Sequence, residues 1–351
     1  MNAEVFTIGG REIGPGRPPF LIAELSGNHN GSLERALRLL RAAVEAGADA
    51  IKLQTYRPDT LTIDHDGPGF VIETGPWAGR RLYELYGEAS TPWEWHEALF
   101  AEGRRLGVPV FSTPFDPTAV DLLEGLEVPA FKIASFEIVD LPLVRRIART
   151  GKPLILSTGM ATEAEILEAV EAAREEGNRE IVVLHCNSGY PTPVGDSRLA
   201  TMARLRELTG CPVGLSDHTL GTAVAVAAVA LGAVAIEKHI TLARAEGGPD
   251  AAFSLEPGEF ARLCRDCRDA FAAIGEPKRG LSPSEESSRV FRRSLYAVAS
   301  IRAGETLTEA NVRSIRPGFG LSPKHLPELL GRRARVDIPR GTPLSWDLIA
   351  D

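Results

Sequence analysis

The sequence predicts a (β/α)₈ barrel followed by a small domain rich in β structure. Eight short apolar runs recur before Gly275, and most are followed by a segment in which apolar residues repeat with helical period. After Gly275 the pattern changes to short alternating runs separated by turns. Eight alternations of strand and helix over about 250 residues match a closed barrel better than an open doubly wound sheet. An open sheet would need a glycine-rich phosphate fingerprint after its first strand, and residues 24–31 do not contain one.

The predicted barrel strands are residues 20–24, 50–54, 108–112, 130–134, 153–157, 181–185, 213–216 and 233–237. Residues 32–47 form the first predicted helix, because Ser32 provides an N-cap and Gly47 a C-terminal stop. Thr162 begins a capping-box sequence before the fifth helix. The Ala-rich residues 222–232 link the last two strands, which makes these strands parallel neighbours.

Four further segments complete the predicted domain organisation. Within a barrel domain of residues 1–275, we expect residues 1–18 to form a hairpin that closes the barrel floor. Residues 55–90 are long for a connecting loop, and loops of this length often act as lids. Residues 276–290 read as a polar linker, and residues 291–351 as the small C-terminal domain.

The C-terminal segment shows signs of an internal β repeat. Residues 303–307 and 340–344 are near-duplicates, and residues 294–300 and 335–338 alternate between apolar and polar. A domain of about 60 residues is marginally stable alone, so docking or dimerisation would help it.

Composition narrows the function classes. The chain has 351 residues, of which 44% are hydrophobic and 25% charged, and its net charge is -8. These values are typical of a globular protein, and the negative charge argues against a nucleic-acid surface. No apolar run reaches the roughly 20 residues of a membrane span, and the first residues do not resemble a secretion signal. We therefore expect a cytoplasmic protein whose four cysteines stay reduced.

Two histidines end the last two predicted strands. His218 and His239 follow neighbouring parallel strands, so both emerge at the same end of the sheet. Neutral imidazoles suit divalent transition ions, and two of them with open positions form a catalytic rather than a structural ligand set. A simple hydrogen-bonding role at each strand end is the alternative, and the pairing favours a metal site.

Other polar residues also follow the predicted strands, at the end where catalytic groups of such barrels lie. They are Glu24, His29, Lys52, Gln54, Thr113, Lys132, Ser135, Glu137, Ser157, Ser188, Tyr190, Ser216, Asp217, Glu237 and Lys238. A lysine inside a strand costs on the order of several kcal/mol unless it is paired. Lys52 and Lys132 therefore either bind an anion or pair with Glu24 or Glu137. Together with a metal ion, the lysines and hydroxyls favour a small phosphorylated or carboxylated substrate.

Seven motifs at these positions resemble the sialic acid synthase family. They are ELSGNHNG at 24–31, IKLQT at 51–55, FSTPFD at 111–116, FKIAS at 131–135, LSTGM at 156–160, LSDH at 215–218 and EKH at 237–239. The tail, residues 291–351, resembles the antifreeze-like (SAF) domain that ends these enzymes. Within the family, the phrases at 26–30 and 248–257 resemble those of pseudaminic acid synthases.

The resemblance implies a condensation of phosphoenolpyruvate with 2,4-diacetamido-2,4,6-trideoxy-L-altrose that releases phosphate. N-acetylneuraminate and legionaminate synthases are the alternatives within the family. It further implies that His218 and His239 bind Mn²⁺ or Mg²⁺ and that Glu24 acts as base or charge stabiliser. The residues implied to bind phosphoenolpyruvate are Lys52, Thr113, Lys132, Ser135, Ser157, Ser188 and Ser216. Those implied to bind the sugar are Gln54, Glu137, Tyr190, Asp250, Phe253 and Arg316.

One position departs from the family pattern. Sialic acid synthases carry Asn where this chain has Ser188, and Asn187 stands one place earlier, so the sequence leaves open which of the two contacts the ligand.

Other functions also remain open. An aldolase would form a Schiff base on Lys52, Lys132 or Lys238. A barrel-type metal hydrolase would need more His ligands. A carbohydrate-binding tail would explain residues 290–351 but not the barrel mouth.

The tail supplies an arginine that the predicted strand ends lack. Arg316 stands before Pro317 in a turn-prone segment. In the family the tail covers the active site of the partner, so the resemblance implies a domain-swapped homodimer in which Arg316 reaches the partner's barrel. A linker of about a dozen residues spans roughly 40 Å when extended, which is long enough. Anchoring of the tail to its own barrel is the alternative.

Overall fold

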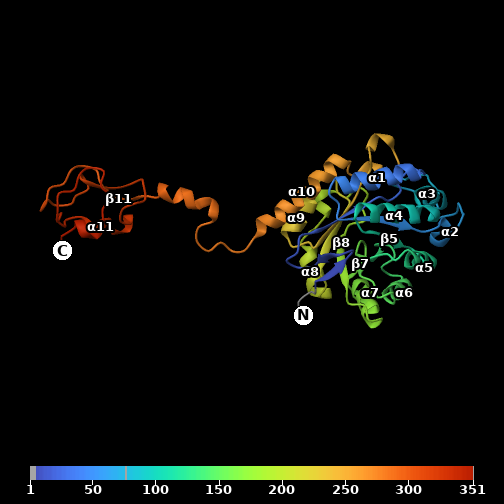
Figure 1. Cartoon of the computed structure of the whole chain (residues 1–351). Helices are drawn as coiled ribbons and strands as arrows, with labels where there is room; N and C mark the ends of the chain where they lie inside the picture. The colour runs from blue at the N-terminus through green and yellow to red at the C-terminus, as the bar shows by residue number, and fades with distance from the viewer. Residues whose placement is uncertain (1–4, 76, 351) are drawn as a thin grey trace. The chain divides into compact units, whose positions relative to one another are not determined.

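The computed structural model describes residues 5–75 and 77–350, and the chain divides into two compact units, residues 1–275 and 276–351. The first unit is a closed ring of eight parallel strands, which confirms the predicted barrel (Figure 1). Around the ring the strands are β3 (Phe20–Glu24), β4 (Ala50–Thr55), β5 (Val110–Pro114), β6 (Phe131–Ile133), β7 (Leu154–Ser157), β8 (Ile181–Cys186), β9 (Val213–Asp217) and β10 (Ala235–His239). Pairing of β10 with β3 closes the ring.

Two strands begin two residues later than predicted. β5 starts at Val110 because the Val108 N–H donates to the Gly103 carbonyl at 3.0 Å and so belongs to the end of the preceding helix. β10 starts at Ala235 for the same reason, since the Ala233 N–H donates to the Ala228 carbonyl at 2.9 Å. In both places the preceding helix takes up apolar residues that read as strand.

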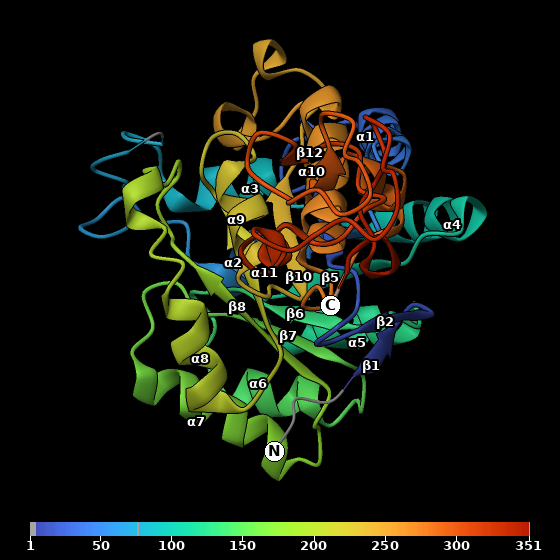
Figure 2. The same ribbon diagram turned by 90° about the vertical axis from the view of Figure 1, so that its left-hand side faces the viewer.

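Helices cover the outside of the ring. They are α1 (Leu33–Glu45), α4 (His96–Leu106), α5 (Pro117–Gly125), α6 (Leu141–Ala148), α7 (Glu163–Glu175), α8 (Thr201–Thr209), α9 (Ala223–Ala230) and α10 (Pro257–Ile274). Ser32 caps α1 through the Arg35 N–H, and Thr162 forms the predicted capping box with Glu165. Figure 2 shows α6, α7 and α8 side by side outside the strands.

The interior of the barrel is apolar at the end where the strands begin. Strand residues that include Phe20, Phe111 and Ile155 form a buried cluster with Phe6, Ile8 and Ile13. The last three belong to the antiparallel hairpin β1 (Phe6–Ile8) and β2 (Arg11–Ile13). The hairpin therefore packs against the first residues of the barrel strands and fills the N-terminal end of the barrel. Polar residues occupy the interior at the other end, where the strands finish.

The connection between β4 and α4 contains two short helices, α2 (Pro58–Leu61) and α3 (Leu82–Ala89), and the 3₁₀ helix η1 (Trp93–Trp95). An antiparallel bridge joins Val71 to Arg81 between α2 and α3. We call residues 56–90 the lid segment. Three more 3₁₀ helices lie in later loops, namely η2 (Val194–Asp196), η3 (Arg244–Glu246) and η4 (Ala251–Phe253).

The second unit begins with the 3₁₀ helix η5 (Pro283–Phe291), which lies largely within the segment predicted as a linker. Its sheet pairs β11 (Ser294–Ala297) with β12 (Val312–Ile315). The remaining elements are η6 (Pro323–His325), α11 (Leu326–Leu329) and η7 (Trp346–Leu348). Leu307 and Leu344 of the repeated phrases both lie in the buried core of this unit.

The alternating run at residues 335–338 does not form a strand. Its backbone meets a different partner at each step, because the Arg335 N–H donates to the Leu348 carbonyl and the Ile338 N–H to the Ile301 carbonyl. A strand needs one continuous ladder, and Val336 is 45% exposed rather than packed. None of the helices in residues 5–75 and 77–350 is long and apolar enough to cross a membrane.

Candidate active site

Four charged residues meet inside the barrel at the carboxyl ends of the strands. Lys52 Nζ lies 2.9 Å from Glu24 Oε2 and 3.0 Å from Glu237 Oε1. Lys132 Nζ lies 3.5 Å from Glu237 Oε2, so Glu237 joins the two lysines. Thr113 Oγ1 accepts a hydrogen bond from Lys52 at 3.4 Å, and Ser216 Oγ donates to Glu237 at 3.3 Å. The predicted lysines thus pair with carboxylates, although Lys132 pairs with Glu237 rather than Glu137.

Burial sets the protonation of this cluster. Burial raises the pKa of Glu24 and lowers that of Lys132, because it penalises the charged form of each side chain. Burial also opposes the charges of Lys52 and Glu237, but here the opposite charges outweigh it. The carboxylates of Glu237 and Glu24 raise the pKa of Lys52, and the two lysines lower the pKa of Glu237. Lys52 and Glu237 therefore stabilise each other's charged forms, whereas burial has the larger influence on Glu24 and Lys132.

The two histidines lie beside this cluster with their ring centres 5.3 Å apart. His218 Nδ1 is 2.9 Å from the Asn187 carbonyl oxygen, to which it donates, and this leaves Nε2 as the acceptor nitrogen. His239 Nδ1 is buried without a hydrogen-bond partner among the described residues. Burial holds the pKa of His239 well below its usual value, so this imidazole is neutral. Groups of three or more His, Cys, Asp and Glu side chains arranged for a metal ion do not occur in the described part of the chain.

Two serine hydroxyls at the strand ends are available to a ligand. Ser157 Oγ and Ser188 Oγ are buried and have no partner within the described structure. Ser135 Oγ accepts a hydrogen bond from the Gly159 N–H at 3.0 Å. A Cβ atom at Gly159 would come within 2.2 Å of Ser188 Oγ and 2.8 Å of Ser135 Oγ. Glycine at this position therefore leaves room for both hydroxyls.

Asn187 and Ser188 have different surroundings. Asn187 Oδ1 accepts hydrogen bonds from the Gly189 N–H at 2.9 Å and from Thr192 Oγ1 at 3.3 Å, and Asn187 Nδ2 donates to the Asp196 carbonyl at 3.3 Å. The Asn187 amide thus makes three hydrogen bonds within its own loop. Ser188 Oγ has no partner among the described residues, so its hydroxyl is the freer of the two groups to bind a ligand.

Five of the six residues predicted to bind the sugar lie in the barrel unit, near the ends of its strands, and the sixth, Arg316, lies in the second unit. Gln54 Nε2 donates to Glu24 Oε1 at 3.1 Å, and Asp250 accepts a hydrogen bond from Ser26 Oγ. The Tyr190 ring centre lies 4.4 Å from that of His218, and the Phe253 ring centre 5.0 Å from that of His239. Glu137 follows β6, and its Oε2 is buried without a partner in the described structure. Burial raises the pKa of Glu137 to about 7.

Comparison with known proteins places this site in a family. Residues 39–279 match the model of the NeuB family, and residues 292–350 match the SAF domain. The chain belongs to the NeuB family. This confirms the resemblance to sialic acid synthases and to their antifreeze-like domain that the motifs indicated.

Three relatives of this NeuB-family chain illustrate the similarity. It is 47% identical over 325 residues to pseudaminic acid synthase of Campylobacter jejuni, covering 93% of this chain and 95% of the relative. It is 44% identical over 332 residues to pseudaminic acid synthase of Helicobacter pylori, with 94% and 98% covered. It is 36% identical over 318 residues to N,N'-diacetyllegionaminic acid synthase of C. jejuni, with 90% and 95% covered.

Solved structures agree with the fold. The chain superposes on N-acetylneuraminic acid (sialic acid) synthetase from Leptospira borgpetersenii with a TM-score of 0.73 at 31% identity. The match covers 82% of this chain and 95% of that structure.

Lys238, one of the lysines considered for a Schiff base, faces away from the NeuB-family mouth. Its Nζ donates to Asp217 Oδ2 and to the Thr219 carbonyl, both at 2.6 Å, and its side chain is only 1% exposed. Asp217 Oδ1 accepts the Thr219 N–H at 2.9 Å. The pair joins β9 to β10 on the outside of the barrel, directly behind the two histidines.

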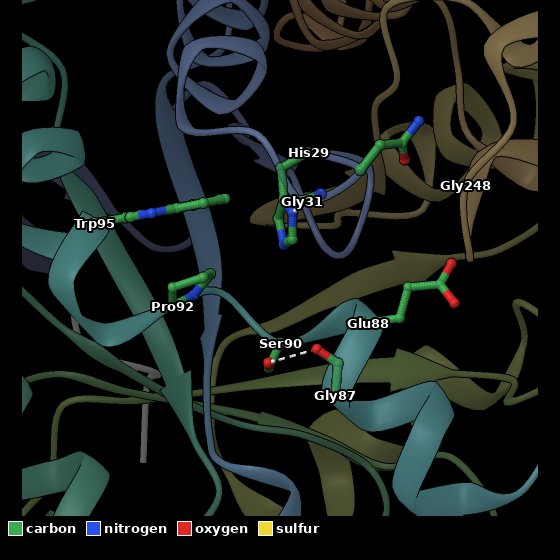
Figure 3. A pocket seen from close by; sticks show the side chains of 9 residues that line it. His29, Gly31, Gly87, Glu88, Ser90, Pro92, Trp95 and Gly248 are labelled. Carbon is green, nitrogen blue, oxygen red and sulfur yellow. Dashed lines mark hydrogen bonds between the residues drawn. The ribbon is translucent and has the colours of Figure 1, made fainter.

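A cavity of about 400 Å³ lies beside the mouth rather than at the strand ends (Figure 3). It is bounded by the loop after β3, the end of α3 and the turn into η1, and it includes His29, Ser90 and Trp95. His29 points into this cavity in Figure 3 and does not contact the lysine cluster. This cavity and the charged cluster at the strand ends are therefore different places.

Two residues of the mouth were not predicted. Ser26 binds Asp250, and Trp77 of the lid segment approaches Tyr190 and Phe253. A lone tryptophan in the glycine-rich stretch 73–79 was the available signal for Trp77. Arg316 lies after β12 in the second unit, where it is exposed and takes part in none of the ion pairs found in residues 5–75 and 77–350.

Proposed function

We propose that this chain is a pseudaminic acid synthase. It joins phosphoenolpyruvate to the open-chain aldehyde form of 2,4-diacetamido-2,4,6-trideoxy-L-altrose and releases phosphate. The observation that carries this proposal is the buried mouth, in which two lysines and free serine hydroxyls lie beside a pair of buried imidazoles. The higher identity to pseudaminic acid synthases than to a legionaminic acid synthase supports the choice of sugar.

The anion-binding groups are Lys52, Thr113, Lys132, Ser135, Ser157, Ser188 and Ser216. An incoming phosphate and carboxylate supply the negative charge that favours the ammonium form of Lys132, whose pKa burial lowers. The unpartnered hydroxyls of Ser157 and Ser188 donate to the same oxygens, and such charge-assisted bonds are the stronger kind. Ser188, not Asn187, fills this role because the Asn187 amide is engaged in its loop.

A divalent ion, Mn²⁺ or Mg²⁺, fits the histidine pair. His218 donates through Nδ1 to a backbone carbonyl, as metal-binding histidines usually do, and His239 Nδ1 is neutral and unpartnered. Two protein ligands leave positions for substrate and water. When bound, the ion supplies Lewis acidity toward the aldehyde oxygen.

The chain's own residues hold the reacting atoms and move protons. Phosphoenolpyruvate C3 bonds to the aldehyde carbon, and the aldehyde oxygen takes up a proton to become a hydroxyl. Water then adds to C2, and the C2–O bond to phosphate breaks as the keto group forms. Glu24 is suited to handle the proton of the attacking water, because burial raises the pKa of its carboxyl and Lys52 holds Oε2 in place at 2.9 Å.

Gln54, Glu137, Tyr190, Asp250 and Phe253 bind the sugar along the rim. Ser26 fixes Asp250, and Glu24 fixes Gln54, so the polar contacts are oriented before the sugar arrives.

Arg316 completes the site from the tail of a second chain in a homodimer. Mixing His218→Ala chains with Arg316→Ala chains under subunit exchange tests this step. Recovered activity supports a shared site, and no recovery after proven exchange means that Arg316 acts in its own chain or not at all.

The Schiff-base alternative has one remaining lysine. Lys238 Nζ already donates to Asp217 and to the Thr219 carbonyl, and its side chain faces the outside of the barrel. The carboxylates of Glu24 and Glu237 beside Lys52 raise its pKa. Burial lowers the pKa of both Lys132 and Lys238, as a nucleophilic amine needs, but of these two only Lys132 lies in the charged cluster at the mouth. Borohydride trapping with substrate, and activity that survives chelation, would favour that mechanism.

The test of function is phosphate release from phosphoenolpyruvate with a panel of acetamido sugars. We expect the diacetamido 6-deoxy sugar of altrose configuration to give the highest kcat/KM. Faster turnover of N-acetylmannosamine would identify a sialic acid synthase, and faster turnover of the legionaminic acid precursor a legionaminate synthase. The cytoplasmic location expected from the sequence stays a prediction.

A further inference from the structure

Three aromatic rings from three different loops pack together, and two of them, Tyr190 and Phe253, contact the histidine pair. Tyr190 follows β8, Phe253 ends η4, and Trp77 belongs to the lid segment. The Trp77 ring centre lies 5.7 Å from that of Tyr190 and 6.5 Å from that of Phe253, and the latter two are 5.3 Å apart. These distances are those of interacting aromatic pairs. Trp77 is therefore part of the wall above the reacting groups, although it is far from them in sequence.

A hydrogen bond fixes the orientation of Trp77. Its Nε1 donates to the Pro249 carbonyl at 2.7 Å, in the loop that also carries Asp250. Indole nitrogen is a donor only, so this bond uses the single polar atom of the side chain. The remaining surface of Trp77 is apolar. Phe253 likewise has no group that could bond to a hydroxyl.

We propose that Trp77 is a specificity-determining residue, which forms with Tyr190 and Phe253 an aromatic subsite for the methyl end of a 6-deoxy sugar. This inference rests on the proposed function. A methyl group gains by leaving water for an aromatic surface. A hydroxyl in the same place loses its water without finding a partner on Trp77 or Phe253, which costs free energy. The subsite thereby favours a sugar with CH₃ at C6 over the same sugar with CH₂OH.

The test compares two sugars that differ by one oxygen, the diacetamido 6-deoxy sugar and its 6-hydroxy counterpart. For the wild-type enzyme we expect kcat/KM to favour the 6-deoxy sugar by about 10- to 200-fold, the range of an apolar pocket. Trp77→Ala lowers this ratio by about tenfold or more, raises KM for the 6-deoxy sugar and leaves KM for phosphoenolpyruvate unchanged. Trp77→Phe loses the hydrogen bond to Pro249 but retains an apolar ring, so we expect it to keep most of the ratio.

Trp93→Ala is the matched control. Trp93 follows the lid segment, but its ring lies 4.0 Å from the Arg57 guanidinium instead of in the aromatic wall, so its loss leaves the sugar ratio unchanged. If Trp77→Phe and Trp77→Ala slow both sugars equally, Trp77 only anchors the loop at Pro249 and the inference is overturned. Absence of phosphate release by the wild-type chain with every acetamido sugar overturns the proposed function itself, which separates the two failures.

Discussion

β9 and β10 carry ionic groups on both faces, and the two faces differ in how completely those groups are paired. On the outer face, Lys238 donates to Asp217 and to the Thr219 carbonyl, and Asp217 in turn accepts the Thr219 N–H. On the inner face, Glu237 lies between Lys52 and Lys132, but its Oε2 is 3.5 Å from Lys132 and has no hydrogen bond in the described structure. His239 Nδ1 is also unpartnered there.

The difference in pairing distinguishes a structural ion pair on the outer face from a candidate binding site on the inner face. Buried polar groups in proteins are normally satisfied, so the outer pair looks like an ordinary connection between strands. Unsatisfied buried groups are costly, and a cluster of them at the end of a barrel where ligands bind indicates a site completed by substrate. Residues one position apart thus have opposite roles because the strand alternates its side chains between the two faces.

Removing an inner-face imidazole should have the largest effect. We expect His218→Ala to lower the rate of phosphate release by about 10³-fold or more, since it removes half of the protein ligands of the proposed metal ion. Chelator should abolish wild-type activity, and Mn²⁺ or Mg²⁺ should restore it. His185→Ala is the control, because His185 is a buried imidazole on β8 whose Nε2 contacts the Ser197 carbonyl. Full activity of His218→Ala, or of wild type in chelator, would rule out this role.

Breaking the outer pair should reduce stability instead. Lys238→Met leaves the Asp217 carboxylate buried and alone, and we expect the free energy of unfolding in urea to fall by about 3–5 kcal/mol. The double variant Asp217→Asn/Lys238→Met should recover part of that loss. At temperatures where the variant is folded, its KM for phosphoenolpyruvate should match wild type. A stable Lys238→Met protein without any activity would contradict a structural role.

Glu137 should make stability depend on pH. Burial raises its pKa from 4.5 to about 7, so between these values the folded chain holds a proton that the unfolded chain has released. The stabilisation is therefore fully present below pH 4.5 and is lost as the pH rises through about 7. Glu137→Gln should remove this slope, which amounts to at most about 3 kcal/mol. Unfolding in urea at several pH values measures it, and an unchanged slope in the variant would assign the pH dependence elsewhere.

The smallest predicted effects concern substitutions of the neighbouring residues Asn187 and Ser188. Ser188→Ala should raise KM for phosphoenolpyruvate by about tenfold, the loss expected for one hydrogen bond to a charged group, with little change in stability. Asn187→Ala should instead lower the free energy of unfolding by about 1 kcal/mol, because it removes three loop hydrogen bonds. The reverse pattern would make Asn187 the ligand contact.

Sequence periodicity was enough to predict the barrel and its polar mouth. The alternation of apolar runs and helical segments fixed the number of strands, and the polar residue after each run indicated which side chains gather at one end. The boundaries of β5 and β10 were less predictable, since Val108 and Ala233 bond back to the preceding helices. The run 335–338 alternates between apolar and polar residues without forming a strand, because alternation does not show whether one continuous partner exists.

By itself the sequence determined the fold class, the family and the set of chemical groups at the mouth, because these depend on residue type and local period. The tertiary structure decided which groups pair. It joined Lys132 to Glu237 rather than Glu137, turned Lys238 outward to Asp217, engaged Asn187 in its loop and left Ser188 free. It also brought Trp77 to Tyr190 and Phe253 from more than a hundred residues away in the chain. Such contacts depend on the closure of the barrel and the course of its loops, which no local pattern in the sequence specifies.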